Sequence, residues 1–334
     1  MTGKERVRTA LSHAQPDKVP YHISFTAPAR EAMARWYGNP SFESSLGNCL
    51  LMLETEPKNS WRRVTGEVWE DQFGVQWDRT IDADIGTVCN SPLGPQNVRT
   101  YPFPDPHDPS RFEDWPAQMA DHRDAFVVAS IGFSLFERAW TLAGMERVLM
   151  AMVDDTQFLN QLLDRILAFN LELIEKACAY PIDAMRFGDD WGQQRGLIMG
   201  PALWREMIGP RVRQMYGLVK SKGKKVFIHS CGKVDELFPD LIESGLDVFN
   251  PFQPEVMDVF QMKRRYGDRL TFFGGISTQK TLPYGTTSQV KDEVGRLLDE
   301  IGRSGGYIAS PAHDIPKDAR PENIAAMIEV LQNQ

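Results

Sequence analysis

The fold prediction starts from one segment of the 334-residue chain, Lys225-Val226-Phe227-Ile228-His229-Ser230-Cys231-Gly232. Its first half is largely apolar and β-prone, and its second half is polar and ends in glycine. A short apolar run bounded in this way is typical of a buried strand. Longer runs with helical periodicity flank it on both sides, which is the pattern of βα units around a parallel sheet. The segment therefore predicts a strand whose carboxyl end carries polar side chains.

Further runs of the same kind follow one another from about Pro181 onward. The other expected strands are Asp183–Phe187, Asp247–Phe249, Leu270–Phe273 and Gly306–Ala309. The expected helices are Pro201–Lys222, Val234–Ser244, Val256–Tyr266, Ser288–Ser304 and Pro321–Gln332. Several of these helices start near proline or end near glycine, as residues suited to helix ends do. The alternation predicts an α/β fold, a (β/α)8 TIM-type barrel.

The N-terminal half is less regular. Val19–Phe25 and Phe126–Ile131 are expected to form two more buried strands. Residues 61–99 alternate in the manner of short antiparallel strands and predict a small β-rich excursion near the mouth of the barrel. The proline-rich stretch Tyr101–Pro109 is expected to be a loop and not a linker. Residues 1–334 are therefore predicted to form a single barrel domain.

Composition excludes several classes of protein. The chain has 37 basic and 45 acidic residues and a net charge of -8, which argues against a nucleic-acid surface or a polybasic membrane patch. No apolar stretch approaches the length of a membrane-spanning helix, and the N-terminus leads into an amphipathic segment. The four cysteines are widely spaced and form no C-x-x-C pair. We expect a cytoplasmic protein with a small-molecule substrate and with neither nucleic-acid nor membrane partners.

Polar residues follow five of the expected strands. These endings are Gly188-Asp189-Asp190, His229-Ser230-Cys231-Gly232, Asn250-Pro251-Phe252-Gln253, Gly274-Gly275-Ile276-Ser277-Thr278-Gln279 and Ser310-Pro311-Ala312-His313-Asp314. In parallel α/β barrels the catalytic groups sit at the carboxyl ends of the strands. A single ending of this kind fits an ordinary turn, because turns are rich in Gly, Asn and Asp. Five in succession favour an active site.

His229 and Cys231 are the sharpest candidates for a metal site. Residues two apart on a strand end point the same way, so an imidazole and a thiolate face one ion. Zinc accepts nitrogen and sulfur ligands, and a catalytic zinc commonly takes three from the protein. His313, two strand ends later, is the expected third ligand. The alternative is that Cys231 fills a buried space and that His229 is a hydrogen-bonded core residue.

The remaining candidates are catalytic carboxylates and substrate-binding groups. Asp189 and Asp190 are expected to act as an acid–base group, a substrate acceptor or a further metal ligand, although either also fits a helix cap. Gly274-Gly275 is expected to let a ligand approach the main chain closely. The candidate substrate-binding residues are His22, Gln253, Gly275 and Gln279. For His22, beside Tyr21, a purely structural role is the competing interpretation.

These residues resemble the uroporphyrinogen decarboxylase superfamily over nearly the whole chain. The resemblance rests on Pro16-Asp17-Lys18-Val19-Pro20, Phe187-Gly188-Asp189-Asp190, His229-Ser230-Cys231-Gly232, Asn250-Pro251-Phe252-Gln253, Phe273-Gly274-Gly275, Ser310-Pro311-Ala312-His313 and Pro321-Glu322-Asn323-Ile324. The superfamily contains haem-pathway decarboxylases and zinc methyltransferases of corrinoid-dependent methyl transfer. Its fold is the barrel that the alternation predicts.

The resemblance is closer to the methyltransferase branch. Uroporphyrinogen decarboxylases open with an Arg-Gln-Ala-Gly-Arg-Tyr motif that holds the substrate carboxylates, whereas Ser24–Arg30 contains a single arginine. The methyltransferase branch carries H-x-C and a later cysteine, and His313 stands at the position of that cysteine. The resemblance thus implies zinc held by His229, Cys231 and His313. It also implies a corrinoid on a partner protein, because the chain lacks a D-x-H-x-x-G corrinoid motif.

Three hypotheses follow from the sequence. The first is a zinc-dependent methyltransferase that moves a methyl group between a small thiol or methoxy compound and a corrinoid protein. The second is a decarboxylase or lyase acting on a small carboxylic acid, with Asp189 or Asp190 as the acid–base group. The third is a binding barrel without catalysis, since a fold does not fix a function.

Overall fold

The computed structural model describes residues 1–334, and at its centre lies a curled sheet of seven parallel strands. Along the sheet the order is β1, β6, β7, β10, β11, β12, β13, and each neighbouring pair is parallel. The strand bounds are β1 Leu50–Glu54, β6 Phe126–Ile131, β7 Ala184–Gly188, β10 Lys225–His229, β11 Val248–Phe252, β12 Thr271–Ile276 and β13 Tyr307–Pro311. The predicted α/β class and its parallel sheet are confirmed.

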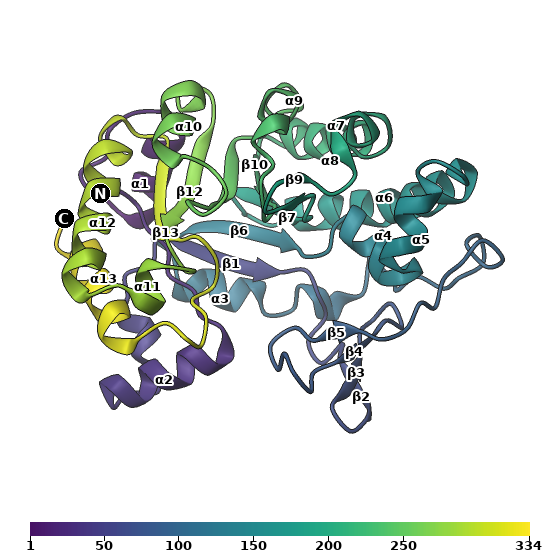
Figure 1. Ribbon diagram of the computed structural model, residues 1–334, viewed down its shortest axis with the longest axis horizontal. Coiled ribbons are helices and arrows are strands. Elements are labelled where there is room, and N and C mark those ends of the chain that lie inside the picture. The colour runs from purple at the N-terminus through teal and green to yellow at the C-terminus, as the bar shows by residue number, and fades with distance from the viewer.

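Helices surround the outside of this sheet (Figure 1). Their bounds are α1 Gly3–Leu11, α2 Ala27–Tyr37, α3 Trp115–Asp121, α4 Phe136–Ala143, α5 Met145–Ala151, α6 Thr156–Cys178, α7 Gly200–Leu203, α8 Gly209–Ser221, α9 Phe238–Glu243, α10 Val259–Tyr266, α11 Thr281–Tyr284, α12 Thr287–Glu300 and α13 Pro321–Gln332. Local capping explains several starts: Thr286 and Gln289 form a reciprocal capping box at α12. None of the helices is long and apolar enough to cross a bilayer.

An eighth regular strand is not formed, so the (β/α)8 prediction is confirmed only in part. The expected strand Val19–Phe25 makes isolated parallel bridges, one of them between Tyr21 and Ala309 of β13. On its other side, the main chain of Ile23 bonds to the side-chain amide of Asn48, at 2.8 and 2.9 Å. Proline at position 20 also removes a main-chain donor. A side chain therefore takes the place of a strand partner, and the ladder is interrupted.

The predicted excursion is a four-stranded antiparallel sheet. Its strands are β2 Arg62–Thr65, β3 Val68–Glu70, β4 Gln76–Asp78 and β5 Thr87–Val88, in sequential order. The buried carboxylate of Asp71 accepts the main-chain N–H groups of Phe73 and Val75 and pairs with Arg138 of α4 at 2.8 Å. One ion pair thus connects the excursion to the helical layer.

Two hydrophobic clusters lie on opposite faces of the curled sheet. Strand residues alternate between them, with Phe126 and Val128 in a cluster of 11 buried residues and Val127 and Ala129 in one of 82. The larger cluster contains buried residues of every long helix except α1 and is therefore outside the curl, whereas Val7 and Leu11 of α1 belong to the smaller cluster. We call the smaller, inner cluster the apolar floor; it comprises Val7, Leu11, Cys49, Leu50, Phe126, Val128, Ala184, Phe227, Val248, Phe273 and Ile308.

A polar layer follows the apolar floor towards the carboxyl ends of the strands. Glu54, Ser130 and Arg186 are register partners across β1, β6 and β7, and His229 is the partner of Asn250 across β10 and β11. These five residues define the polar layer. On the inner face, the sheet therefore presents these charged and hydrogen-bonding groups beyond the apolar floor, towards the end where the strands finish.

We expect the Asp71→Ala substitution to lower the free energy of unfolding by about 3–5 kcal/mol, because it leaves Arg138 as a buried charge without its partner. Denaturant unfolding followed by circular dichroism measures this change. Asp82→Ala in the same excursion is the matched control, since Asp82 is exposed and accepts only the N–H of Asp84. Equal stability of the two variants would contradict the role given to Asp71.

Candidate metal centre

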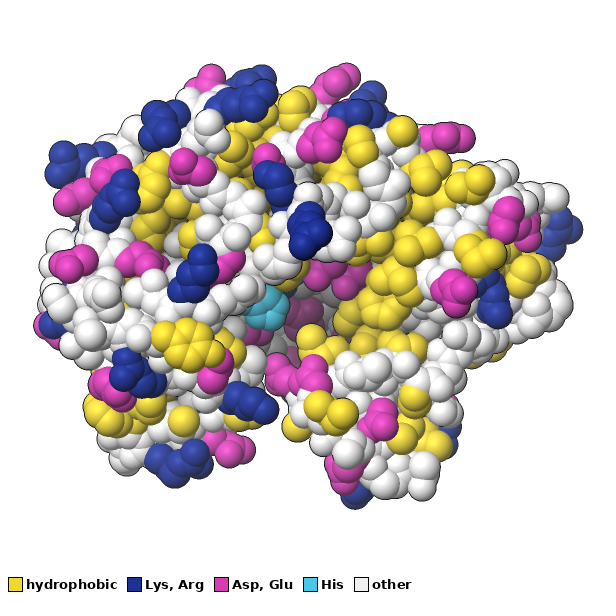
Figure 2. All heavy atoms as spheres, viewed as in Figure 1, with side chains coloured by type: hydrophobic (Ala, Val, Ile, Leu, Met, Phe, Trp, Pro, Cys, Tyr) yellow, Lys and Arg dark blue, Asp and Glu magenta, His cyan; other side chains and the backbone are white.

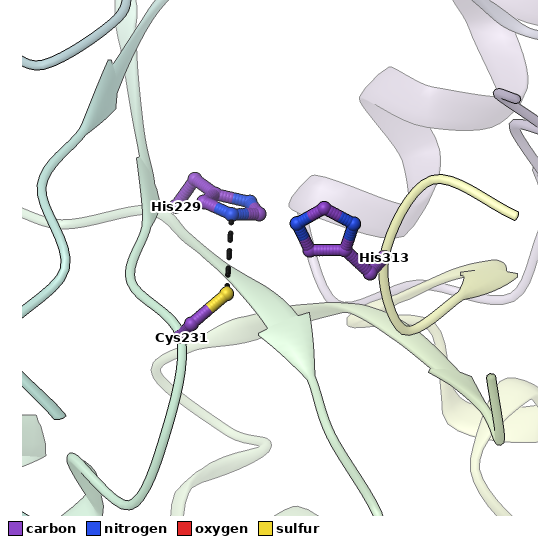
Figure 3. Close-up of side chains that lie close together, drawn as sticks. All are labelled: His229, Cys231 and His313. Carbon is purple, nitrogen blue, oxygen red and sulfur yellow. Dashed lines mark hydrogen bonds between the residues drawn. The ribbon is translucent and has the colours of Figure 1, made fainter. Parts of the chain in front are cut away.

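His229, Cys231 and His313 converge although they come from two distant parts of the chain. His229 ends β10, Cys231 follows it, and His313 lies just beyond β13. One potential ligand atom from each lies within 4.8 Å of the others (Figure 3). The Nε2 atom of His229 is 3.4 Å from the Cys231 sulfur, and the two imidazole rings are 5.5 Å apart between centroids. The three residues predicted as metal ligands are thus brought together.

The ring of His229 is held by a second polar residue. Asn250 donates from Nδ2 to the carbonyl of Phe273 at 3.0 Å, so its Oδ1 is left as an acceptor. That oxygen lies 2.5 Å from Nδ1 of His229, which therefore carries the proton. The lone pair of Nε2 then faces Cys231. A hydrogen bond to the remote ring nitrogen is the usual support for a metal-bound histidine.

The protonation of the group suits a cation. Burial lowers the pKa of His229 to about 3, and the positive charge of Arg186 acts in the same direction. The imidazole is therefore neutral and free to bind a metal. Burial, together with the Asp190 and Glu137 carboxyls, raises the pKa of the Cys231 thiol. A bound cation offsets this cost because it stabilises the thiolate. Two imidazoles and one thiolate are a donor set that zinc accepts.

Asp190 supports the loop that carries Cys231. Its Oδ1 accepts the Cys231 main-chain N–H at 2.7 Å. Burial raises the pKa of Asp190, and burial with the nearby Asp190 and Asp189 charges raises that of Glu137 well above its usual value. Two carboxyl groups therefore lie close together beside the metal group. At least one of them is stabilised in the neutral form by this arrangement.

Asp189 instead faces helix α4. Its carboxylate accepts the N–H groups of Glu137, Phe136 and Leu135 at 2.8, 3.1 and 3.3 Å and the indole N–H of Trp191 at 2.7 Å. The side chain is 1% exposed. Asp189 therefore caps a helix, although α4 precedes it in the chain. Its carboxylate makes no hydrogen bond to the metal group, and only its main-chain N–H donates to the carbonyl of His229, at 2.9 Å. Its catalytic role stays a prediction without support from the geometry.

A cavity of about 860 Å³ opens beside the metal group. It is lined by both metal-group histidines, by Asn250, Glu54 and Arg186 of the polar layer, and by residues of the segment after Pro20. Figure 2 shows a central hollow in the surface, with acidic side chains inside it and a histidine at its edge. Ile85 of the excursion lines the same cavity. The excursion therefore forms part of one wall.

The four predicted substrate-binding residues have different positions. His22 lines the cavity, and its Nδ1 is buried without a hydrogen-bond partner. Gln253 is buried under the metal loop and accepts the N–H of Gly232 at 3.4 Å. Gln279 is exposed in the turn after β12 and does not line the cavity. Of these three residues, only His22 lines the cavity.

Gly275, the fourth of these residues, also lies outside the cavity lining. Its φ is +103°, and a Cβ atom there would lie 2.7 Å from the hydroxyl of Tyr307. At Gly274, with φ of +134°, a Cβ would lie 2.7 Å from the main-chain nitrogen of Phe252. Close protein packing therefore accounts for both glycines. The expected role of Gly274-Gly275 in letting a ligand approach the main chain stays a prediction.

Sequence reasoning missed several residues that the structure places at the site. Arg186 is a charged residue in a run of apolar strand residues, Ala184-Met185-Arg186-Phe187, and that position was a usable signal. Glu54 ends β1, whose leucine-rich sequence resembles a helix as much as a strand. Asp314 follows His313 and receives a hydrogen bond from Ser24. No sequence signal paired these groups, because their contacts join distant parts of the chain.

The chain belongs to the uroporphyrinogen decarboxylase family, whose model, described as "Uroporphyrinogen decarboxylase (URO-D)", matches residues 124–334. Uroporphyrinogen decarboxylase of Methylococcus capsulatus is 22% identical over 248 residues, which cover 71% of this chain and 69% of that protein. Methylcobamide:CoM methyltransferase MtaA of Methanosarcina barkeri is 26% identical over 132 residues, covering 39% of this chain and 36% of that one. The resemblance inferred from the motifs is thereby confirmed.

A solved structure of a methyltransferase from Methanosarcina mazei superposes with a TM-score of 0.71 over 100% of this chain and 99% of that chain. The two sequences are 17% identical. At this identity the likeness shows a shared fold. The α/β architecture of this chain is therefore shared with that structure over its whole length.

We expect Asn250→Ala to weaken zinc binding by about 10–100-fold, because the His229 ring loses the acceptor that fixes its orientation. Competition with a chromogenic chelator measures the affinity. Asn250→Asp is the matched variant, since it loses the donor to Phe273 but keeps an acceptor oxygen for His229, and it should retain more zinc affinity than Asn250→Ala. Unchanged affinity in Asn250→Ala would show that Asn250 does not support the metal.

Proposed function

We propose that the protein is a zinc-dependent methyltransferase that moves a methyl group between a small thiol or methoxy compound and a corrinoid carried by a separate protein. The observation that carries the proposal is the convergence of His229, Cys231 and His313 within 4.8 Å at the edge of a large cavity. Membership of the uroporphyrinogen decarboxylase family and the partial similarity to MtaA support a methyltransferase within this superfamily.

His229, Cys231 and His313 would hold the zinc ion. When bound, zinc supplies Lewis acidity that lowers the pKa of a thiol or polarises a methoxy oxygen. Asn250 keeps the Nε2 atom of His229 pointed towards Cys231, and Asp190 fixes the main chain of Cys231. A single thiolate neutralises less of the ion's charge than two thiolates would. This donor set therefore suits a methoxy substrate, whose alkoxide leaving group needs strong polarisation, at least as well as a thiol.

The corrinoid would arrive on a partner. The chain has no D-x-H-x-x-G motif of its own, and the metal group lies at the open carboxyl-end face of the sheet. The cavity of about 860 Å³ holds a small substrate with room to spare. A partner that docks over the cavity would bring its cobalt to the substrate methyl group. These features support a two-protein system.

One observation favours a second candidate, a decarboxylase or lyase acting on a small carboxylic acid. Asp190 and Glu137 form a pair of buried carboxyls beside Cys231, and a neutral carboxyl of this kind can donate a proton to a carbanion left by loss of CO₂. Relatives named uroporphyrinogen decarboxylase agree with such chemistry. The single arginine in Ser24–Arg30 argues against a polycarboxylate tetrapyrrole as the substrate.

We expect about one zinc ion per purified chain, and its loss in Cys231→Ser and in His313→Ala, because each substitution removes one of three ligands. Elemental analysis of the purified proteins measures the content. Cys89→Ser is the matched control, since Cys89 is an exposed free cysteine beside β5. Zinc-free wild-type protein, even from zinc-supplemented growth, would sink the metal site and favour the lyase.

We expect methyl transfer between methylcobalamin and small thiols, or from methoxy compounds to cob(I)alamin, to depend on zinc. The absorbance change on conversion of methylcobalamin to cob(I)alamin measures the first reaction, and the reverse change measures the second. Rates should fall by at least about 100-fold in Cys231→Ser, in line with loss of an essential metal. CO₂ release from small acids that persists in the presence of a chelator would instead identify the lyase.

A further inference from the structure

Arg186 is a cation inside the sheet that the proposed chemistry has not used. It lies on β7 in register with Ser130 on one side and with Phe227 of the apolar floor on the other. Its side chain lines the cavity that contains His229 and His313. A charged side chain among apolar strand residues is expensive unless something compensates the charge.

The guanidinium group lacks a close partner. Its one side-chain hydrogen bond is a long contact of 3.5 Å from Nη1 to the hydroxyl of Ser130, and its Nε is buried with no acceptor. It forms no ion pair with any carboxylate oxygen within 4.0 Å. Of the three acidic residues that line the cavity, Glu43 pairs with Arg30, so Glu54 and Asp314 balance the charge of Arg186 only at longer range. Planar donors remain free to bind an anion in two-pronged fashion.

His22 presents a second free nitrogen to the same cavity. Its Nδ1 is buried and has no partner, and its ring contacts that of Phe273 edge-on at 6.1 Å between centroids. Burial lowers the pKa of His22 to about 4, so the ring is neutral and offers one N–H donor. Two buried and unpartnered nitrogen groups thus line one cavity. Unpaired buried polar atoms are rare in folded proteins and call for a ligand or water.

We propose that Arg186 and His22 form an oxyanion subsite, so that the substrate of this enzyme carries a carboxylate or a similar anionic group in addition to its methylated sulfur or oxygen. This subsite defines the substrate class for the proposed methyl transfer. It rests on that proposed function only in assuming that the other end of the substrate carries the methyl group. Arg186 binds the anion, and His22 donates to it. The other end of the substrate reaches the group formed by His229, Cys231 and His313.

The sheet register fixes the size of such a substrate. His229 is the register partner of Gly188, and Arg186 lies two residues before Gly188 on the same strand. Strand geometry separates the Cα atoms of Arg186 and His229 by roughly 8 Å. Both side chains point to the inner face, since alternate residues and register partners share a face. A compact molecule with a methoxy or methylthio group a few bonds from its carboxylate fits between them.

Glu54 is the group that would oppose an anion. It is in register with Ser130 and lies one strand further from Arg186, and its exposed side chain lines the cavity. Burial raises its pKa, which favours the neutral acid, although Arg186 acts against this shift. A neutral Glu54 is compatible with a bound carboxylate. Replacing it by glutamine removes any residual repulsion and gives the experiment a variant with the opposite expected effect.

Direct binding tests the subsite without methyl transfer, zinc-dependent turnover or a corrinoid. Isothermal titration calorimetry on the purified protein compares 4-methoxybenzoate with 4-methoxybenzamide, and (methylthio)acetate with 2-(methylthio)acetamide. We expect each acid to bind at least about tenfold more tightly than its amide, as the loss of a charge-assisted pair predicts. Arg186→Gln should remove this preference, Arg186→Lys should keep part of it, and Glu54→Gln should keep or strengthen it.

Arg205→Gln is the matched control, because Arg205 is half-exposed in the π-helical turn Trp204–Ile208 between α7 and α8 and pairs with Asp240. It should leave the acid preference unchanged, and thermal unfolding of each variant verifies that it is folded. Equal binding of acids and amides, no binding of either acid at millimolar concentration, or an acid preference that survives Arg186→Gln would overturn the subsite. An Arg186-dependent acid preference in a protein without methyl transfer would support the subsite and count against the methyltransferase alone.

Discussion

The parallel register of the seven strands is the constraint on which the site depends. Because neighbouring strands run the same way, their carboxyl ends finish together, and residues in register share one face. The apolar floor therefore meets a single polar layer, and the transition occurs within two residues on β10, from Phe227 to His229. The floor excludes water from below. The polar groups above it act in a medium of low dielectric constant, where each charge is felt strongly.

The low dielectric constant links the metal group to the rest of the cavity. Without a cation, burial favours the protonated thiol of Cys231 and the neutral ring of His229. Burial and mutual repulsion disfavour the ionised carboxyls of Asp190 and Glu137, and a nearby positive ion would stabilise these ionised forms. Arg186 supplies positive charge to the same cavity and acts on His229, Asp190 and Cys231. The site thus combines carboxyl groups that favour a metal cation with one cation, Arg186, that favours an anion.

The sequence predicted those parts of the fold that depend on local pattern. The helix Pro321–Gln332 and the strand Phe126–Ile131 have the bounds expected from periodicity and proline placement. The strand Leu50–Glu54 escaped prediction because its residues have no β-branching, and Val19–Phe25 failed as a strand because Asn48 takes up its hydrogen bonds. Such a contact between a side chain and a main chain leaves no trace in periodicity.

The candidate site also contains residues that local sequence pattern predicts and residues that it does not predict. His229 and Cys231 were found because their spacing of two has a local geometric meaning, and His313 was found because it follows an equivalent strand end. Arg186 escaped because the search followed strand ends, whereas its side chain projects from within a strand.

The position of Arg186 also explains why this cavity residue can be charged within the sheet. The floor supplies packing below Arg186, and the cavity supplies solvent or ligand above it. The guanidinium group of Arg186 is stabilised most when an anion binds to it from the cavity. Substrate binding and the local stability of β7 should therefore be coupled.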